Sequence, residues 1–244
     1  MIEVKQLHKS FGKIAAVQGV SFSAADGRIT GLLGPNGAGK TTTLRILYTL
    51  LRPDSGTALV DGYNATTHAA EVQRRIGVLP DNRGLYARLT TREHIRYYGR
   101  LQGLKGAALE RQIDELIKLL DMQDIADRRT EGFSQGQRVK VAIARALVHQ
   151  PQNILLDEPT NGLDVMSTRA LRSFIRRLRD EGKCVLFSSH IMQEVSALCD
   201  TIVVIAQGHV TAAGTPDELR RATGQANLED AFVAAVGTGE GLML

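Results

Sequence analysis

The chain has 244 residues, 43% of them hydrophobic and 23% charged, a composition that excludes a disordered chain, a collagen-like repeat and a coiled coil. Thirty Lys and Arg residues against 26 Asp and Glu give a net charge of +4, which suits polyanions, an anionic membrane surface and a nucleotide pocket equally well. No apolar run approaches the ~18 uncharged residues of a membrane-spanning helix, and residues 1–9 lack the pattern of a secretion leader.

The N-terminal part of the chain predicts strands, then a glycine-rich loop, then a helix. Short β-like stretches and a tight turn at Asp26-Gly27 predict strands at residues 2–4, 16–17, 20–23 and 28–33. The glycines that follow Leu33 end the last of these strands. Leucines at 44, 47, 50 and 51 then continue at helical spacing.

The middle of the chain, from about residue 86 to 150, predicts a helical lobe. Its clearest sign is an amphipathic stripe formed by Leu109, Ile113, Leu116, Ile117 and Leu120. The lobe interrupts the strand-forming parts of the chain, so we expect it to be an insertion.

From Asn153 onward, strands and helices alternate again. The pattern predicts strands at residues 154–156, 184–187 and 201–206 and a helix at 168–180. Such alternation implies right-handed crossovers and a mostly parallel sheet. We therefore expect an α/β fold with a single domain over residues 1–236 and a flexible, glycine-rich tail at 237–244.

The glycine-rich segment matches the phosphate-binding loop, Gly-x-x-x-x-Gly-Lys-Thr, in its expected place between a strand and a helix. Glycines let backbone N–H groups turn toward an anion, and the helix adds its positive end. Lys40 would reach the β- and γ-phosphates, and the Thr41 hydroxyl would ligate Mg²⁺. The residues expected to bind ATP here are Gly34, Pro35, Asn36, Gly37, Ala38, Gly39, Lys40, Thr41 and Thr42.

An apolar strand at residues 153–156 ends in two carboxylates, Asp157 and Glu158. Alone, this is a common way for a strand to end. In a parallel sheet, however, it brings an acid to the edge where the phosphate loop lies. Asp157 then suits the Mg²⁺ shell, and Glu158 suits a base for the attacking water.

The segment Phe133-Ser134-Gln135-Gly136-Gln137 resembles the signature of ATP-binding cassette (ABC) ATPases, with Phe for the usual Leu and Gln for a Gly. Ser134 and Gln137 also have the spacing of a capping box, and the start of a capped helix is an anion site. The resemblance covers residues 2–219. It implies a P-loop NTPase fold of ABC type, with a mostly parallel core, an N-terminal antiparallel β subdomain and the inserted helical lobe.

The same resemblance assigns roles to four more residues. Phe11 would stack on adenine with help from Val17, although Phe11 also suits simple packing on a strand. Asp164, in the sequence Asn-Gly-Leu-Asp, belongs to a loop that crosses to a partner subunit. His190 would contact the γ-phosphate, whereas a structural role is expected for the other five histidines.

One position departs from the family pattern. Asp81 follows the strand at 76–79 where the family usually has Gln, so it adds a negative charge near the γ-phosphate. Three alternatives stay open: Asp81 ligates Mg²⁺, it stands back behind a bridging water, or it only shapes the loop.

In the family, the signature and the phosphate loop face opposite ways, which implies a head-to-tail dimer that encloses ATP and Mg²⁺. Residues 83–90 would contact a separate transmembrane permease, unless they are a solvated loop.

Nucleic acid is not expected as a partner, because the arginines of residues 169–179 have no interleaved aromatic residues. The two cysteines have neither disulfide nor zinc spacing, so we expect a cytoplasmic protein. The permease would hold it at the inner face of the membrane.

The resemblance therefore implies the ATP-hydrolysing subunit of an ABC exporter. Residues 79–86, 131–137 and 190–195 are similar to those of bacterial sodium-extruding exporters, which makes sodium the expected cargo. A drug, a lipid or another small solute is the alternative. Another alternative is a soluble ABC ATPase that acts on nucleic acid or ribosomes, whereas an inactive cassette is disfavoured because the residues expected to act on ATP are present.

Overall fold

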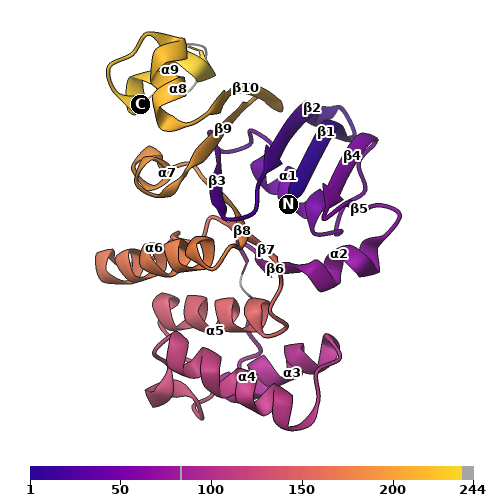
Figure 1. Ribbon diagram of the computed structural model, residues 1–244, viewed down its shortest axis with the longest axis vertical. Coiled ribbons are helices and arrows are strands. Elements are labelled where there is room, and N and C mark those ends of the chain that lie inside the picture. Colours follow the sequence, from indigo (N-terminus) through magenta and orange to yellow (C-terminus); the bar gives the residue numbers. More distant parts are fainter. Residues whose placement is uncertain (83, 238–244) are drawn as a thin grey trace.

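The computed structural model describes residues 1–82 and 84–237, and within them ten strands form two sheets (Figure 1). Arg83 and all of the predicted flexible tail except Gly237 lie outside the described residues.

The first sheet is antiparallel and has the strand order β2-β1-β4-β5. It confirms the expected N-terminal antiparallel subdomain. The separate short strands predicted at 16–17 and 20–23 are wrong, because both belong to one long strand, β2. The bounds are β1 (Ile2–Phe11), β2 (Ile14–Ala24), β4 (Ser55–Val60) and β5 (Tyr63–Asn64).

The second sheet is mostly parallel, as predicted, with the order β10-β9-β3-β8-β7-β6. All its neighbouring strands are parallel except β10, which runs antiparallel at one edge. Along β7, Ile154 and Leu156 face one core and Leu155 faces the other, so the sheet is covered on both faces. The bounds are β3 (Arg28–Leu33), β6 (Ile76–Leu79), β7 (Asn153–Asp157), β8 (Cys184–Ser189), β9 (Thr201–Ala206) and β10 (His209–Gly214).

Helix α1 (Lys40–Leu47) packs between the two sheets, and its buried Leu44 and Leu47 join the core that both sheets share. The prediction that helical spacing continues to Leu50 and Leu51 is wrong. The helix ends at Leu47, and Thr49 adopts a left-handed φ of +67°. Leu50 is 70% exposed. A left-handed residue cannot continue a right-handed helix.

Three helices and a short 3₁₀ turn form the helical lobe, seen at the bottom of Figure 1. Two of these helices begin with a capping box, one from Thr90 and Glu93 and the other from Ser134 and Gln137. The predicted apolar stripe is buried inside the lobe. The bounds are α3 (Thr91–Leu101), α4 (Gly106–Leu119), η1 (Gln123–Ile125) and α5 (Gln135–Leu147), with α2 (Ala69–Arg75) before them.

The remaining helices cover the parallel sheet and the C-terminal end of the chain. Helix α6 begins at Val165, earlier than predicted, because the Asp164 side chain accepts a hydrogen bond from the N–H of Ser167 and caps it. Within the part of the chain that the structure describes, no helix combines the length and apolar character needed to cross a bilayer. The bounds are α6 (Val165–Asp180), α7 (Met192–Leu198), α8 (Pro216–Thr223) and α9 (Leu228–Val236).

A buried histidine in the lobe predicts how stability depends on pH. The Nε2 of His94 accepts a hydrogen bond from the N–H of Tyr86 at 2.8 Å, so the ring is neutral there. Burial first, and then the nearby Arg145 charge, lower the pKa of His94 below its ordinary 6.5. As the pH falls, the unfolded chain therefore takes up this proton before the folded one, and the free energy of unfolding decreases below about pH 6.5.

His94→Gln isolates this effect, because the amide oxygen accepts the same hydrogen bond but does not titrate. Between pH 7 and pH 5, we expect the wild-type protein to lose more free energy of unfolding than the variant. Urea unfolding at each pH measures both. Parallel stability profiles would contradict the assignment of a neutral, buried His94.

Candidate functional site

Four parallel strands bring their C-terminal ends to the same edge of the second sheet. The phosphate loop follows β3, Glu158 follows β7, His190 follows β8 and Asp81 comes just after β6. Side chains from these four loops line a pocket of about 270 Å³. The register of the sheet thus gathers residues that are far apart in the sequence, as expected for ligand sites in α/β folds.

The phosphate loop needs two of its glycines for steric reasons. A Cβ on Gly34 would lie 2.1 Å from the carbonyl oxygen of Ile205. Gly39 has a φ of +104°, and a Cβ there would lie 2.4 Å from the carbonyl oxygen of Ala16. Only glycine fits such close backbone contacts. The loop can therefore turn into the start of α1, where backbone N–H groups would favour an anion.

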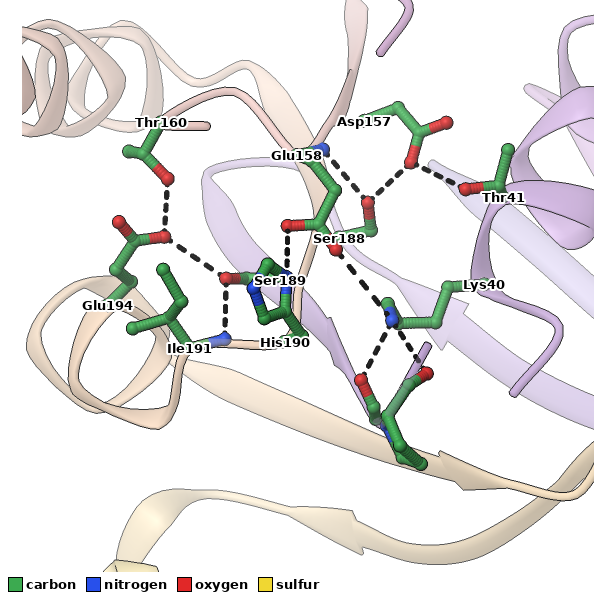
Figure 2. A network of polar contacts seen from close by, with 12 residues as sticks. Lys40, Thr41, Asp157, Glu158, Thr160, Ser188, Ser189, His190, Ile191 and Glu194 are labelled. Carbon is green, nitrogen blue, oxygen red and sulfur yellow. Dashed lines mark hydrogen bonds and ion pairs between the residues drawn. The ribbon is translucent and has the colours of Figure 1, made fainter. Parts of the chain in front are cut away.

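Lys40 is the cation of the pocket, and its side chain is 5% exposed. Its Nζ donates hydrogen bonds to the carbonyl oxygens of Gly34 at 2.8 Å and Pro35 at 3.0 Å. The same Nζ lies 3.7 Å from the Oε1 of Glu158 (Figure 2). Burial lowers the pKa of Lys40, and the negative charges of Glu158 and Asp157 oppose this shift.

Asp157 is almost fully buried beside the start of α1. Its Oδ1 accepts hydrogen bonds from the Ser188 hydroxyl at 2.6 Å and the Thr41 hydroxyl at 3.1 Å. Its Oδ2 is buried with no hydrogen-bond partner among the described residues. Burial raises the pKa of this carboxyl, and the hydrogen bonds from its two hydroxyl partners oppose the shift. A nearby cation would favour its charged form.

These donors fit Mg²⁺. Across residues 1–82 and 84–237, no group of three His, Cys, Asp or Glu could hold a metal by itself. Mg²⁺ that accompanies a nucleotide needs only one or two protein oxygens, because phosphates and waters complete its shell. The unpaired Oδ2 of Asp157 and the adjacent Thr41 hydroxyl are such oxygens. Asp81, the position that departs from the family pattern, lines the same pocket.

Glu158 has a strained backbone and a carboxylate held between two partners. Its φ is +47°, a left-handed value that costs energy for a non-glycine residue and that is typical of functional sites. Its N–H donates to the Ser188 hydroxyl at 3.1 Å. Its carboxylate lies near Lys40 and contacts His190, with 3.0 Å between Oε2 and the ring Nδ1. A base at the rim of a phosphate pocket would be placed in this way.

The predicted signature residues do not line this pocket. Ser134 and Gln137 cap α5 as expected, and Gly136 lies beside Ser167 at the start of α6. The loop before α6 is close by, since a Cβ on Gly162 would lie 3.5 Å from the side chain of Gln135. The signature therefore lies beside the loop that ends at Asp164, and Asn161 at the start of that loop reaches the pocket.

The two residues expected to contact adenine differ in exposure. Phe11 is 47% exposed at the end of β1, with the Nζ of Lys9 5.6 Å from its ring centre. Val17 is buried and packs near Gly39. Phe11 is thus free to stack on a base, whereas Val17 supports the loop from behind.

Sequence reasoning missed the serines and the acid that hold the site in place. Ser188 links Asp157 to the backbone of Glu158, and Ser189 contacts Glu194 on α7. Thr160 donates to the same Glu194. No motif marks these residues, and only the register of β7 against β8 brings them together.

Comparison with known proteins gives consistent matches. A family model described as "ABC transporter" matches residues 17–161. The chain is 45% identical over 227 residues to the ABC transporter ATP-binding protein NatA of Bacillus subtilis (strain 168), covering 93% of this chain and 92% of the relative. It is 36% identical to the linearmycin resistance ATP-binding protein LnrL of the same organism, covering 90% of this chain and 70% of the relative.

Two solved structures are also similar. An ATP-binding subunit of an ABC transporter superposes with a TM-score of 0.89 and 30% identity, covering 97% of this chain and all of the other. A dimeric, post-hydrolysis state of an ATP-binding cassette bound to ADP and Pi has a TM-score of 0.80 and 25% identity, covering 88% of this chain and 98% of the other.

Proposed function

The chain belongs to the ABC transporter family as one of its ATP-hydrolysing cassettes, and on that premise we propose that it powers export across the cytoplasmic membrane through a separate membrane subunit. One observation carries the ATPase part of this proposal. A single pocket gathers a phosphate loop, Lys40, Glu158 and His190, with Asp157 buried next to Thr41. The similarity to LnrL, which is named for linearmycin resistance, favours export over import.

In this proposal, each group in the pocket has one task. The loop N–H groups and Lys40 bind the β- and γ-phosphates of ATP. Thr41 and Asp157 would hold Mg²⁺, which when bound would neutralise phosphate charge. Glu158 accepts a proton from the attacking water. His190 orients Glu158 through their 3.0 Å contact and lies at the pocket rim, where it can reach the γ-phosphate.

A second copy of the chain completes the site. The signature residues Ser134, Gln135, Gly136 and Gln137 lie on a surface apart from the pocket, at the N-terminus of α5, where an anion is favoured. Two copies related by a two-fold axis can place each signature against the ATP of the other. The dimeric cassette among the similar structures supports this arrangement. Loss of the γ-phosphate would then release the dimer and drive the permease.

The permease contact is proposed at the loop before α3. Tyr86 is 52% exposed, and its ring packs edge-on against Tyr97 of α3, with 5.8 Å between ring centres. Tyr97 and Leu101 are exposed on the same helix. An apolar surface of this kind, rimmed by charges, is typical of a protein interface. It would hold the cassette at the inner face of the membrane.

Sodium is the cargo we propose, on the resemblance of residues 79–86, 131–137 and 190–195 to sodium-extruding exporters. A drug is the second candidate, because LnrL is named for linearmycin resistance. The membrane partner decides between them, since cargo chemistry belongs to the site that binds it.

The test is an affinity pull-down of the chain from detergent-solubilised membranes of its host. We expect a multi-spanning protein in stoichiometric amount, through which efflux of sodium or of a drug can be assayed. Tyr86→Asp should reduce its capture, whereas Leu50→Asp, at an exposed leucine far from this loop in the sequence, should not. A soluble partner or nucleic acid, with no membrane protein, would contradict the proposal.

A further inference from the structure

A second hydrogen-bond network lies behind the pocket and centres on one buried carboxylate, Glu194 of α7 (Figure 2). A single oxygen, Oε2, accepts hydrogen bonds from the Thr160 hydroxyl at 2.5 Å and the Ser189 hydroxyl at 3.1 Å. The Ser189 hydroxyl in turn accepts a hydrogen bond from the N–H of Ile191 at 3.0 Å. Glu194 itself does not line the pocket.

The network joins the two chain segments that carry the proposed base and its partner. Thr160 lies two residues after Glu158, whereas Ser189 and Ile191 flank His190. We propose that Glu194 is a positioning residue for ATP hydrolysis, which sets the distance between Glu158 and His190 without touching nucleotide. This inference rests on the roles proposed above for Glu158 and His190.

The physical argument starts from burial. Glu194 is 5% exposed and Ser189 fully buried, and a buried carboxylate is tolerated only when hydrogen bonds satisfy it. Removing its side chain leaves two hydroxyl groups without their acceptor. The Thr160 segment and the His190 turn then lose their common anchor. A displacement of about 1 Å between reacting groups can cost up to about a hundredfold in rate.

The network does not hold the phosphate-binding groups. Lys40 is held by carbonyl oxygens of the loop, and Asp157 by Thr41 and Ser188. We therefore expect loss of Glu194 to lower kcat and to leave KM for ATP nearly unchanged. This split separates positioning from a general loss of structure, which would also reduce binding.

The experiment measures kcat and KM for ATP in the full chain with four single variants and one double variant. We expect Glu194→Ala and Thr160→Val each to lower kcat by between about ten- and a hundredfold, with KM within about threefold of wild type. Glu194→Gln and Thr160→Ser should stay within about threefold, because one amide oxygen can accept both bonds and a serine hydroxyl can still donate. The double variant Glu194→Ala/Thr160→Val should be no slower than Glu194→Ala alone.

Two results would overturn the inference: a wild-type kcat in Glu194→Ala, or effects that multiply in the double variant. If Glu194→Ala fails to fold, the comparison of Thr160→Val with Thr160→Ser still decides. Ser196→Ala is the matched control, since Ser196 lies exposed on the same helix and donates to the Gln193 carbonyl oxygen of its own turn.

The test also separates this inference from the roles on which it rests. Full ATP hydrolysis by Glu158→Gln would refute the proposed base. An inactive Glu158→Gln together with a fully active Glu194→Ala would refute the positioning role alone.

Discussion

Replacing Glu158 with Gln will lower steady-state ATP hydrolysis by at least about a hundredfold while ATP binding is retained, because a general base contributes roughly 10²- to 10⁴-fold. The amide keeps the size of the side chain and can still accept a hydrogen bond from His190. It cannot take a proton from water. Lys40, which is proposed to bind the phosphates, stays in place because carbonyl oxygens of the loop hold its Nζ.

Phosphate release measures the loss of turnover, and light scattering with saturating ATP measures the state of the chain. Since the variant binds ATP but cannot remove the γ-phosphate, it should accumulate as a dimer. Glu181→Gln is the matched control, because Glu181 is exposed at the end of α6 and pairs with Arg177 on the surface. Wild-type turnover, or a monomer at saturating ATP, would contradict the proposed role of Glu158.

Replacing Lys40 with Met will weaken ATP binding by about a hundredfold or more, because charge-assisted contacts to phosphate in a buried pocket are strong. The variant should nevertheless be as stable as the wild-type protein, or more stable. Burial lowers the pKa of Lys40, which means that the fold disfavours its charge relative to water. Methionine fills a similar volume without that cost.

Two measurements on the same sample check this prediction. Titration with a fluorescent ATP analogue and Mg²⁺ gives the affinity, and urea unfolding without nucleotide gives the stability. Lys5→Met, at an exposed lysine on β1, should change neither. An unchanged affinity for nucleotide would remove Lys40 from the phosphate site, and a large loss of stability would contradict the effect of burial on its charge.

The parts of the fold that could be predicted are those that short segments encode. The glycine pattern before Lys40 predicted a strand, a loop and a helix, and the structure has β3, the loop and α1 in that order. The mostly parallel sheet followed from the alternation of strands and helices after Asn153, and it is confirmed. The Ser134 and Gln137 capping box was also found, since its two partners are three residues apart.

Helix and strand ends were predicted less well, because they depend on backbone conformation at single residues. The left-handed Thr49 ends α1 before Leu50, although leucine spacing favours a longer helix. The cap at Asp164 starts α6 earlier than its apolar stripe indicates. The bulged β2 was divided into two strands because its register shifts interrupt the alternation of side chains.

The hydrogen bonds that hold the site residues in place could not be predicted, because they join segments that are distant in the sequence. Glu194 meets Thr160 across 34 positions of the sequence, and Asp157 meets Thr41 across 116. The hydroxyls of Ser188 and Ser189 on the buried strand β8 carry no pattern of their own. The strained φ of Glu158 is likewise invisible in the sequence, because nothing in its residue type favours it.

The central claim is that the signature of one copy completes the ATP site of another, and mixing two inactive variants tests it most directly. Lys40→Met removes the phosphate-binding cation, and Gly136→Asp adds a negative charge where the γ-phosphate of the other copy would lie. Each variant alone should be inactive, since both of its sites are defective. In a mixed dimer, one site combines the intact Lys40 of one copy with the intact signature of the other. At a one-to-one ratio, random pairing makes half of the dimers mixed, so we expect about a quarter of the wild-type ATPase rate. If two folded variants stay inactive at every mixing ratio, the claim that the sites are completed in trans is wrong.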